Sequence, residues 1–205
     1  MTTDTAFARL VSLACHDLRT PLATVHGWAR TLPRLTDLDE RAARYVDMIA
    51  TASSDMADLL DLLALAARIE AGRYEPALRD VGTLELADLT AERLGVERVH
   101  LEGGGGSVSV DPKAAQQALT GLVACALHQG RLQEVGITAD SSGFVIGPVE
   151  AGTASTCLGD DLRDFGAAAA VRVVDALGGT VEAVGETLVV RLRAATSAGE
   201  TGAGP

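Results

Sequence analysis

The chain has 205 residues, which is enough for one domain of ordinary size or for two small ones. Apolar residues make up 47% of the chain and aromatic residues only 3%, so alanine, leucine and valine do most of the packing, which favours helical bundles over aromatic-rich β-sandwiches. The formal net charge of -11 gives a surface that repels DNA phosphates and anionic lipids, so neither a nucleic acid nor a membrane is an expected partner.

The N-terminal segment, residues 4–33, is predicted to form one amphipathic helix. Pro21 removes a backbone donor and is expected to kink this helix, and Pro33 is expected to end it. Apolar residues recur every three or four positions, as on one face of a helix. They are Phe7, Val11, Ala14, Leu18, Leu22, Val25, Ala29 and Leu32.

Residues 37–71 have the strongest periodicity and predict a second helix roughly 50 Å long. Thr36 or Asp37 is expected to cap it, with Glu40 completing a capping box, and Gly72 is expected to end it. Its apolar residues alternate steps of four and three, which defines a heptad seam. The seam consists of Leu38, Ala42, Tyr45, Ile49, Ala52, Met56, Leu59, Leu63 and Ala66. A hairpin of two such helices cannot bury this seam alone, so two copies are expected to form a four-helix bundle as a homodimer.

The order of the predicted elements after residue 80 indicates an α+β domain, with helices on one face of a mostly antiparallel sheet. The predicted helices cover residues 84–94, 112–129 and 161–177. The predicted strands cover residues 96–101, 108–110, 135–139, 144–146, 180–184 and 187–192. The first two of these strands are expected to be joined as a hairpin by the glycine run 103–106.

Three segments follow from these boundaries. Residues 1–74 are predicted to form the helical hairpin, and residues 80–195 the α+β domain. Residues 196–205 are small and polar and are predicted to be a disordered tail.

The three cysteines, Cys15, Cys125 and Cys157, show no CxxC spacing, and their small odd number is typical of a reducing compartment. The sequence shows neither a signal peptide nor a run of about 18 apolar residues. We therefore expect a cytoplasmic protein that receives its signal from another protein.

The segment His-Asp-Leu-Arg-Thr-Pro-Leu that begins at His16 carries the most specific pattern. His16 lies between Ala14 and Leu18 of the apolar stripe, about 200° round the helix from each, so it is expected to face solvent. A free imidazole is mostly neutral at pH 7 and can attack a phosphorus atom. Asp17 can accept the ring proton and leave the other nitrogen nucleophilic. Thr20, one turn further on, can position a water that hydrolyses a phosphohistidine.

This heptapeptide resembles the H-box of bacterial sensor histidine kinases, which lies on the first helix of a dimerisation and phosphotransfer domain. The resemblance implies that His16 is the phosphoacceptor, Asp17 its acid/base partner, Thr20 a phosphatase-assisting residue and Pro21 the helix kink. It also implies response-regulator receiver domains as partners, with a hybrid kinase as a further candidate.

The second half resembles the ATP-binding domain of the same kinases in outline. Asp111-Pro112 and the apolar residues that follow are similar to the family's N-box helix. The family has asparagines where this chain has Gly121 and Cys125, and the second asparagine binds the magnesium that bridges the nucleotide phosphates. A thiol is a poor ligand for Mg²⁺, which prefers oxygen.

The other nucleotide boxes are also altered. The aspartate that binds adenine in the family is missing from residues 144–152. The glycine-rich box keeps Gly166 but places Asp164 where phosphates would lie. The stretch 152–164 is too short for a full nucleotide lid, whereas residues 172–182 keep the structural pattern. The resemblance therefore implies a degenerate ATPase-like domain with no stably bound cofactor, and Mg²⁺ only on the partner receiver domain.

The sequence leaves three functions open. The one we favour is a histidine phosphotransferase that accepts and donates a phosphoryl group through His16 without binding ATP. The alternatives are an ATP-dependent histidine kinase with diverged nucleotide boxes and a non-catalytic dimeric regulator or phosphatase of two-component signalling. No metal site is expected in this chain, because His26, His100 and His128 show no ligand spacing with cysteines or carboxylates.

Overall fold

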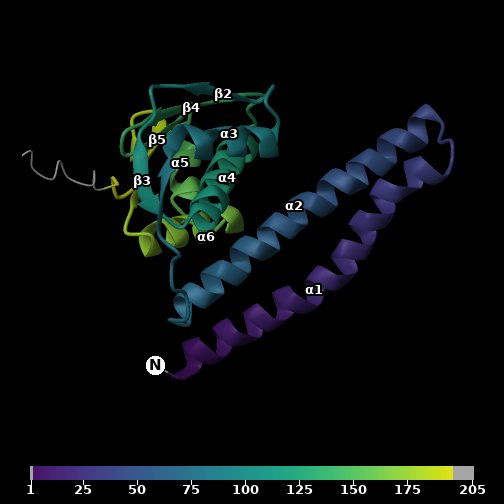
Figure 1. The fold of residues 1–205 in the computed structure, drawn as a ribbon, viewed down its shortest axis with the longest axis horizontal. Helices are drawn as coiled ribbons and strands as arrows, with labels where there is room; N and C mark the ends of the chain where they lie inside the picture. Colours follow the sequence, from purple (N-terminus) through teal and green to yellow (C-terminus); the bar gives the residue numbers. More distant parts are fainter. Residues whose placement is uncertain (1, 196–205) are drawn as a thin grey trace, which may run out of the picture. The chain divides into compact units, whose positions relative to one another are not determined.

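The protein is represented by a computed structural model that describes residues 2–195 (Figure 1). The chain divides into two compact units, with the division between Tyr74 and Glu75. The tail predicted at residues 196–205 lies outside the described residues. No helix within residues 2–195 has the long apolar stretch that a membrane crossing requires.

The first unit is an antiparallel hairpin of two long helices, α1 (Thr2–Leu35) and α2 (Glu40–Glu70), as the apolar periodicity predicts (Figure 1). The prediction that Pro33 ends the first helix is wrong, because α1 continues to Leu35. A proline ring interferes with the turn that precedes it and removes one donor, so a helix can continue for a few residues beyond it.

The cap of α2 differs from the one expected. Asp39, not Thr36 or Asp37, is the N-cap, and its carboxylate accepts a hydrogen bond from the Ala42 amide at 2.7 Å. Glu40 is therefore the first helical residue and cannot complete a capping box, which needs the third helical position. Gly72 ends the helix as predicted, since its positive φ of 63° lets its amide bond back to Ile69.

The helix–helix contact of the hairpin uses small side chains of α1, namely Ala8, Cys15 and Ala29, which are buried. The predicted buried stripe through Ala14 and Leu18 is wrong for a single chain, because both residues are exposed. These three buried residues are separated by multiples of seven positions, so they lie on one line along α1. Their small side chains let the two helices approach closely, and the larger apolar residues lie to one side of the contact.

The second unit contains a five-stranded sheet in the order β2-β4-β5-β7-β6, in which only β2 and β4 are parallel. A separate two-stranded sheet pairs β1 with β3. The strands are β1 (Arg79–Gly82), β2 (Val99–Glu102), β3 (Ser107–Val110), β4 (Val135–Asp140), β5 (Gly143–Gly147), β6 (Thr180–Val184) and β7 (Thr187–Arg191). The helices are α3 (Thr83–Leu94), α4 (Pro112–Gln129), α5 (Ala151–Cys157) and α6 (Phe165–Ala176). This confirms the predicted α+β fold class.

The predicted hairpin between β2 and β3 is wrong. β2 pairs with β4 and β3 pairs with β1, so the glycine run 103–106 connects two different sheets. A Cβ at Gly103 would lie 2.2 Å from the carbonyl oxygen of Ala139, and one at Gly106 would lie 2.3 Å from the Cα of Ser141. The glycines are therefore needed for close packing of this connection against the end of β4.

The sequence patterns did not predict two short elements, β1 and α5. β1 has only four residues and lies just before the first helix predicted in the second unit, and α5 has only seven residues, too few for a helical period to be visible. The helix predicted from residue 161 begins instead at Phe165, where Asp164 caps it by accepting from the Ala167 amide at 2.9 Å.

The core of this unit lies between the sheet and α3, α4 and α6. Alternate residues of β4 are buried, as expected of a strand with one covered face. The largest fully buried side chains include Phe144, Leu86, Leu122, Leu127, Ile137, Ile146 and Leu188.

The turn between β4 and β5 is held by Asp140. Its carboxylate accepts from the Ser142 amide at 2.7 Å and pairs with Arg191 of β7. The hydrogen bond from the Ser142 amide, together with the Arg191 guanidinium, lowers the pKa of the Asp140 carboxyl.

We expect Asp140→Ala to lower the free energy of unfolding at pH 7 by about 1 kcal/mol, since the ionised carboxylate is partly exposed. A carboxyl whose pKa is lowered by folding stabilises the protein above its unfolded pKa of about 3.9 and loses this effect as the pH falls through the folded value. In urea denaturation the difference between wild type and variant should therefore shrink below about pH 4. Asp88→Ala, at an exposed position of α3, is the control; an equal pH dependence of both variants would contradict the assignment.

Candidate functional site

His16 lies in the middle of α1 with its side chain in solvent, 76% exposed. Its exposure is as predicted, although the stripe from which it was inferred is not buried in one chain. Its Nδ1 lies 3.2 Å from Oδ1 of Asp17, which is also exposed. When Nδ1 carries the proton and donates to this carboxylate, Nε2 keeps its lone pair and points to an uncovered surface.

Thr20 is also exposed, one helical turn after His16. Its backbone carbonyl accepts a hydrogen bond from the Thr24 hydroxyl at 3.2 Å. Residues four apart on a helix are neighbours on its surface, so the Thr20 hydroxyl and the His16 imidazole share one side of α1.

Arg19, between His16 and Thr20 along the chain, forms an ion pair with Asp61 of α2. This pair ties the helical turn that carries His16 to the second helix. Sequence reasoning gave Asp61 no role, although an acidic residue within the apolar run 59–63 was a usable indication of a specific partner.

The two long helices leave a set of large apolar side chains uncovered, which we call the apolar hairpin face. Its α1 members are Phe7, Leu10, Leu18, Val25, Trp28 and Leu32. Its α2 members are Tyr45, Met48, Ile49, Met56 and Leu59. At about 100° per residue, both sets are rotated in the same sense from the helix–helix contact, so they lie on the same side of an antiparallel hairpin. His16 lies on the opposite side of α1.

In the second unit, Cys125 and Asp164, which hold nucleotide-box positions, contact residues of neighbouring helices. Cys125 of α4 is buried, and its Sγ lies 3.1 Å from Sγ of Cys157, the last residue of α5. Asp164 accepts from the Gln129 side chain at 3.2 Å and caps α6. The Asp164 carboxylate therefore takes up an N–H of the helix start that would otherwise face a phosphate.

These residues fit a magnesium–nucleotide complex poorly. Neither Gly121 nor Cys125 supplies an oxygen ligand for Mg²⁺, and the Asp164 carboxylate repels phosphate. Within residues 2–195, no group of three or more histidine, cysteine, aspartate or glutamate side chains is arranged to hold a metal ion.

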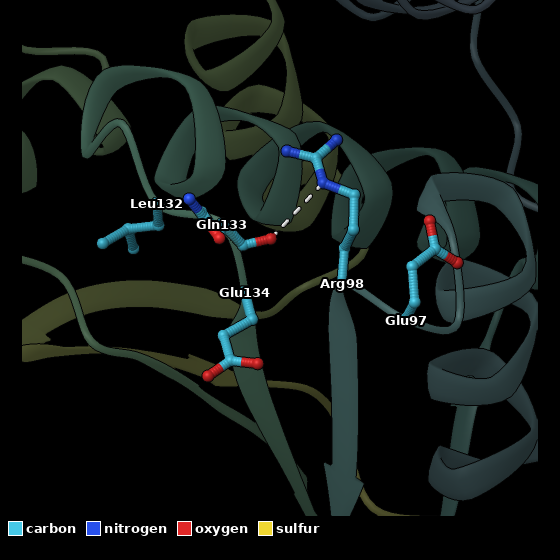
Figure 2. A pocket seen from close by; sticks show the side chains of 5 residues that line it. All are labelled: Glu97, Arg98, Leu132, Gln133 and Glu134. Atoms are coloured by element: carbon cyan, nitrogen blue, oxygen red, sulfur yellow. Dashed lines mark hydrogen bonds between the residues drawn. The ribbon is translucent and has the colours of Figure 1, made fainter.

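An open cavity of about 580 Å³ lies at the start of β2 and β4 (its lining side chains are drawn in Figure 2). It is lined by Glu97, Arg98, Leu132, Gln133 and Glu134, and Arg98 donates from Nε to the Gln133 carbonyl oxygen at 3.5 Å. Its two carboxylates against one guanidinium disfavour a phosphate group, and none of the nucleotide-box positions lines it.

Comparison with known proteins agrees with this description of the first unit. The His Kinase A (phospho-acceptor) domain matches residues 8–72. The probable sensor histidine kinase TcrY of Mycobacterium tuberculosis is 30% identical over 96 residues, which are 47% of this chain and 18% of that protein. The sensor protein DivL of Caulobacter vibrioides is 30% identical over 122 residues, which are 56% of this chain and 16% of that protein. The matched part thus spans less than a fifth of either relative.

Among solved structures, full-length ShkA in complex with AMPPNP is similar with a TM-score of 0.58 and 20% identity, covering 91% of this chain and 47% of that one. The histidine kinase AdeS of Acinetobacter baumannii is similar with a TM-score of 0.51 and 17% identity, covering 88% of this chain and 98% of that one. At these identities the likeness is one of fold. Residues 8–72 therefore form a His Kinase A (phospho-acceptor) domain, and the chain has the fold of a bacterial two-component histidine kinase core.

Proposed function

We propose that this chain is a histidine phosphotransferase, which accepts a phosphoryl group on His16 from an aspartyl phosphate of a response-regulator receiver domain and donates it to another receiver. The observation that carries the proposal is the exposed His16 imidazole with Nδ1 held by Asp17 and Nε2 uncovered.

The transfer follows from this geometry. The Nε2 lone pair attacks phosphorus, the P–N bond forms as the P–O bond to the receiver aspartate breaks, and the aspartate leaves as a carboxylate. Asp17 stabilises the positive charge that develops on the ring. The contribution of this chain is to hold the His16 nucleophile in position; Mg²⁺ bound to the partner receiver would supply the charge that neutralises the phosphoryl oxygens. Thr20 positions a water when the phosphohistidine is hydrolysed.

The active form in this proposal is a homodimer in which two hairpins cover each other's apolar hairpin face and form a four-helix bundle. His Kinase A domains of histidine kinases are dimeric and pair with response regulators. Because His16 lies on the opposite side of α1 from that face, dimerisation leaves the imidazole accessible to a receiver domain.

An ATP-dependent kinase is the second candidate, and the similarity to the fold of ShkA with bound AMPPNP favours it. Against it stand the missing oxygen ligands at Gly121 and Cys125 and the carboxylate of Asp164 at the start of α6. We therefore favour the phosphotransferase, which needs no ATP, over the ATP-dependent kinase.

Two measurements on the full chain separate the candidates. Calorimetric titration with Mg-ATP is expected to give no heat up to millimolar nucleotide, since the second unit lacks the usual ligands. Incubation with radiolabelled Mg-ATP should leave the protein unlabelled, whereas labelled phospho-receivers should label it. Binding in the micromolar range together with labelling from ATP would contradict the proposal and establish the kinase.

A further inference from the structure

The second unit holds two cysteines that the proposed function does not use. Cys125 of α4 and Cys157 of α5 are far apart in sequence, and both side chains are fully buried. Their Sγ atoms lie 3.1 Å apart. We call them the thiol pair.

We propose that the thiol pair is a redox modification site, at which Cys125 and Cys157 form a reversible disulfide that fastens α5 to α4. A disulfide requires about 2.05 Å between the sulfur atoms, so the pair must close by about 1 Å. A small rotation of either side chain about its Cα–Cβ bond supplies this movement. Two thiols much further apart would need a shift of the backbone as well.

The surroundings of the pair favour one thiol as the nucleophile. The hydrogen bond with Cys125 lowers the pKa of the Cys157 thiol, although burial opposes this effect. The same hydrogen bond, together with burial, raises the pKa of the Cys125 thiol. Cys157 is therefore the thiolate that reacts first, and Cys125 is the thiol that resolves the intermediate.

Hydrogen peroxide is the oxidant that we name for this step. The Cys157 thiolate attacks one peroxide oxygen, the O–O bond breaks, and a sulfenic acid and one water result once a proton is taken up. The Cys125 sulfur then attacks the sulfenic sulfur, the S–S bond forms, and the hydroxyl leaves with the Cys125 proton as a second water. Two thiols lose two electrons to one peroxide, and a dithiol reductant reverses the step by exchange.

Access to the buried pair comes from α5. A helix of seven residues is marginal by itself, so local opening of α5 exposes the pair to a small oxidant. Once formed, the disulfide opposes this opening and restrains the connection from α5 to α6, residues 158–164. That connection carries Leu162 at positive φ with 78% of its surface exposed.

Cys15 provides an internal control. It is buried in the first unit, where burial raises the pKa of its thiol. Because the other two cysteines pair with each other, Cys15 is expected to stay reduced when the thiol pair is oxidised.

The experiment oxidises the full chain with hydrogen peroxide and counts free thiols before and after, with denaturation to expose all three. We expect the count to fall from three to one, with a mass loss of two hydrogen atoms. Trypsin, which cleaves after Lys113, Arg131 and Arg163, should release peptides 114–131 and 132–163 joined until a dithiol is added. The midpoint of thermal unfolding should rise by on the order of 10 °C in the oxidised form.

Matched variants sharpen the test. Cys15→Ser should keep the cross-link, and Cys125→Ser and Cys157→Ser should each lose it and the rise in unfolding temperature. Because peptide mapping uses wild-type protein, the result does not depend on the variants folding. Three thiols remaining after oxidation, sulfinic acid in place of the cross-link, or cross-links through Cys15 would each overturn the proposal.

Discussion

Replacing His16 with glutamine is expected to abolish acceptance of the phosphoryl group, by at least about 1,000-fold, when a labelled phospho-receiver is the donor. Glutamine removes the only ring nitrogen that the H-box segment offers as a nucleophile, while its size and polarity suit an exposed helical position. Since His16 is exposed and packs against little, helix content and unfolding temperature should remain at the wild-type values.

The matched control is His128→Gln, which changes an exposed histidine at the end of α4 in the second unit. It should transfer at the wild-type rate. Asp17→Asn is expected to lower the rate by about 100-fold without abolishing labelling, because the carboxylate assists the ring but forms no bond to phosphorus. Full activity of His16→Gln with the same donor would show that the chain acts as a scaffold rather than as a carrier.

Replacing Ile49 with aspartate is expected to convert the dimer to a monomer at micromolar concentration. Ile49 lies near the middle of the apolar hairpin face and is exposed in the single chain. Each buried isoleucine contributes roughly 2 kcal/mol, and the dimer contains two copies, so its dissociation constant should rise by about 1,000-fold or more. Light scattering coupled to gel filtration measures the change directly.

Thr51→Asp is the control for charge, because Thr51 is an exposed polar residue two positions further along the same helix. It should leave the dimer intact. Two results would rule out the bundle that we propose. One is a wild-type protein that is monomeric even at about ten times the micromolar concentration of the assay, and the other is an Ile49→Asp variant that stays dimeric.

Hydrophobic periodicity was enough to predict the long helices and most of the second unit. The heptad pattern of residues 37–71 has one physical solution, a long helix with a continuous apolar side, and the structure confirms it. It could not say which apolar residues contact the partner helix of the same chain. The hairpin contact uses Ala8, Cys15 and Ala29, whose small size matters more than their hydrophobicity.

The sequence did not predict the strand pairings that depend on residues far apart in the chain. A glycine run between two short strands favours a hairpin by local rules. Here β2 pairs with β4 at the edge of the five-stranded sheet, and β3 pairs with β1, whose own sequence has no strand pattern. Tertiary packing decides between these pairings, and a local pattern carries no information about it.

In the candidate site, too, the sequence predicted the features that lie along one helix but not the contacts between helices. His16, Asp17 and Thr20 are neighbours because of their spacing on one helix, and His16 is exposed as predicted although the stripe used to predict it is also exposed. The Arg19–Asp61 ion pair joins two helices, and the contact of Cys125 with Cys157 joins two helices across 32 positions of sequence. Such contacts depend on how elements pack, so they became visible only in the structure.

Identifying the phosphorylated residue decides whether His16 carries the phosphoryl group. The four histidines of the chain fall on four different tryptic peptides, and the one that contains His16 covers residues 10–19. Protein labelled by a phospho-receiver should be digested and sequenced by mass spectrometry at alkaline pH, where phosphohistidine survives. We expect phosphate on His16 of that peptide; phosphate on a peptide with another histidine, or on none of the four, would show that His16 is not the carrier.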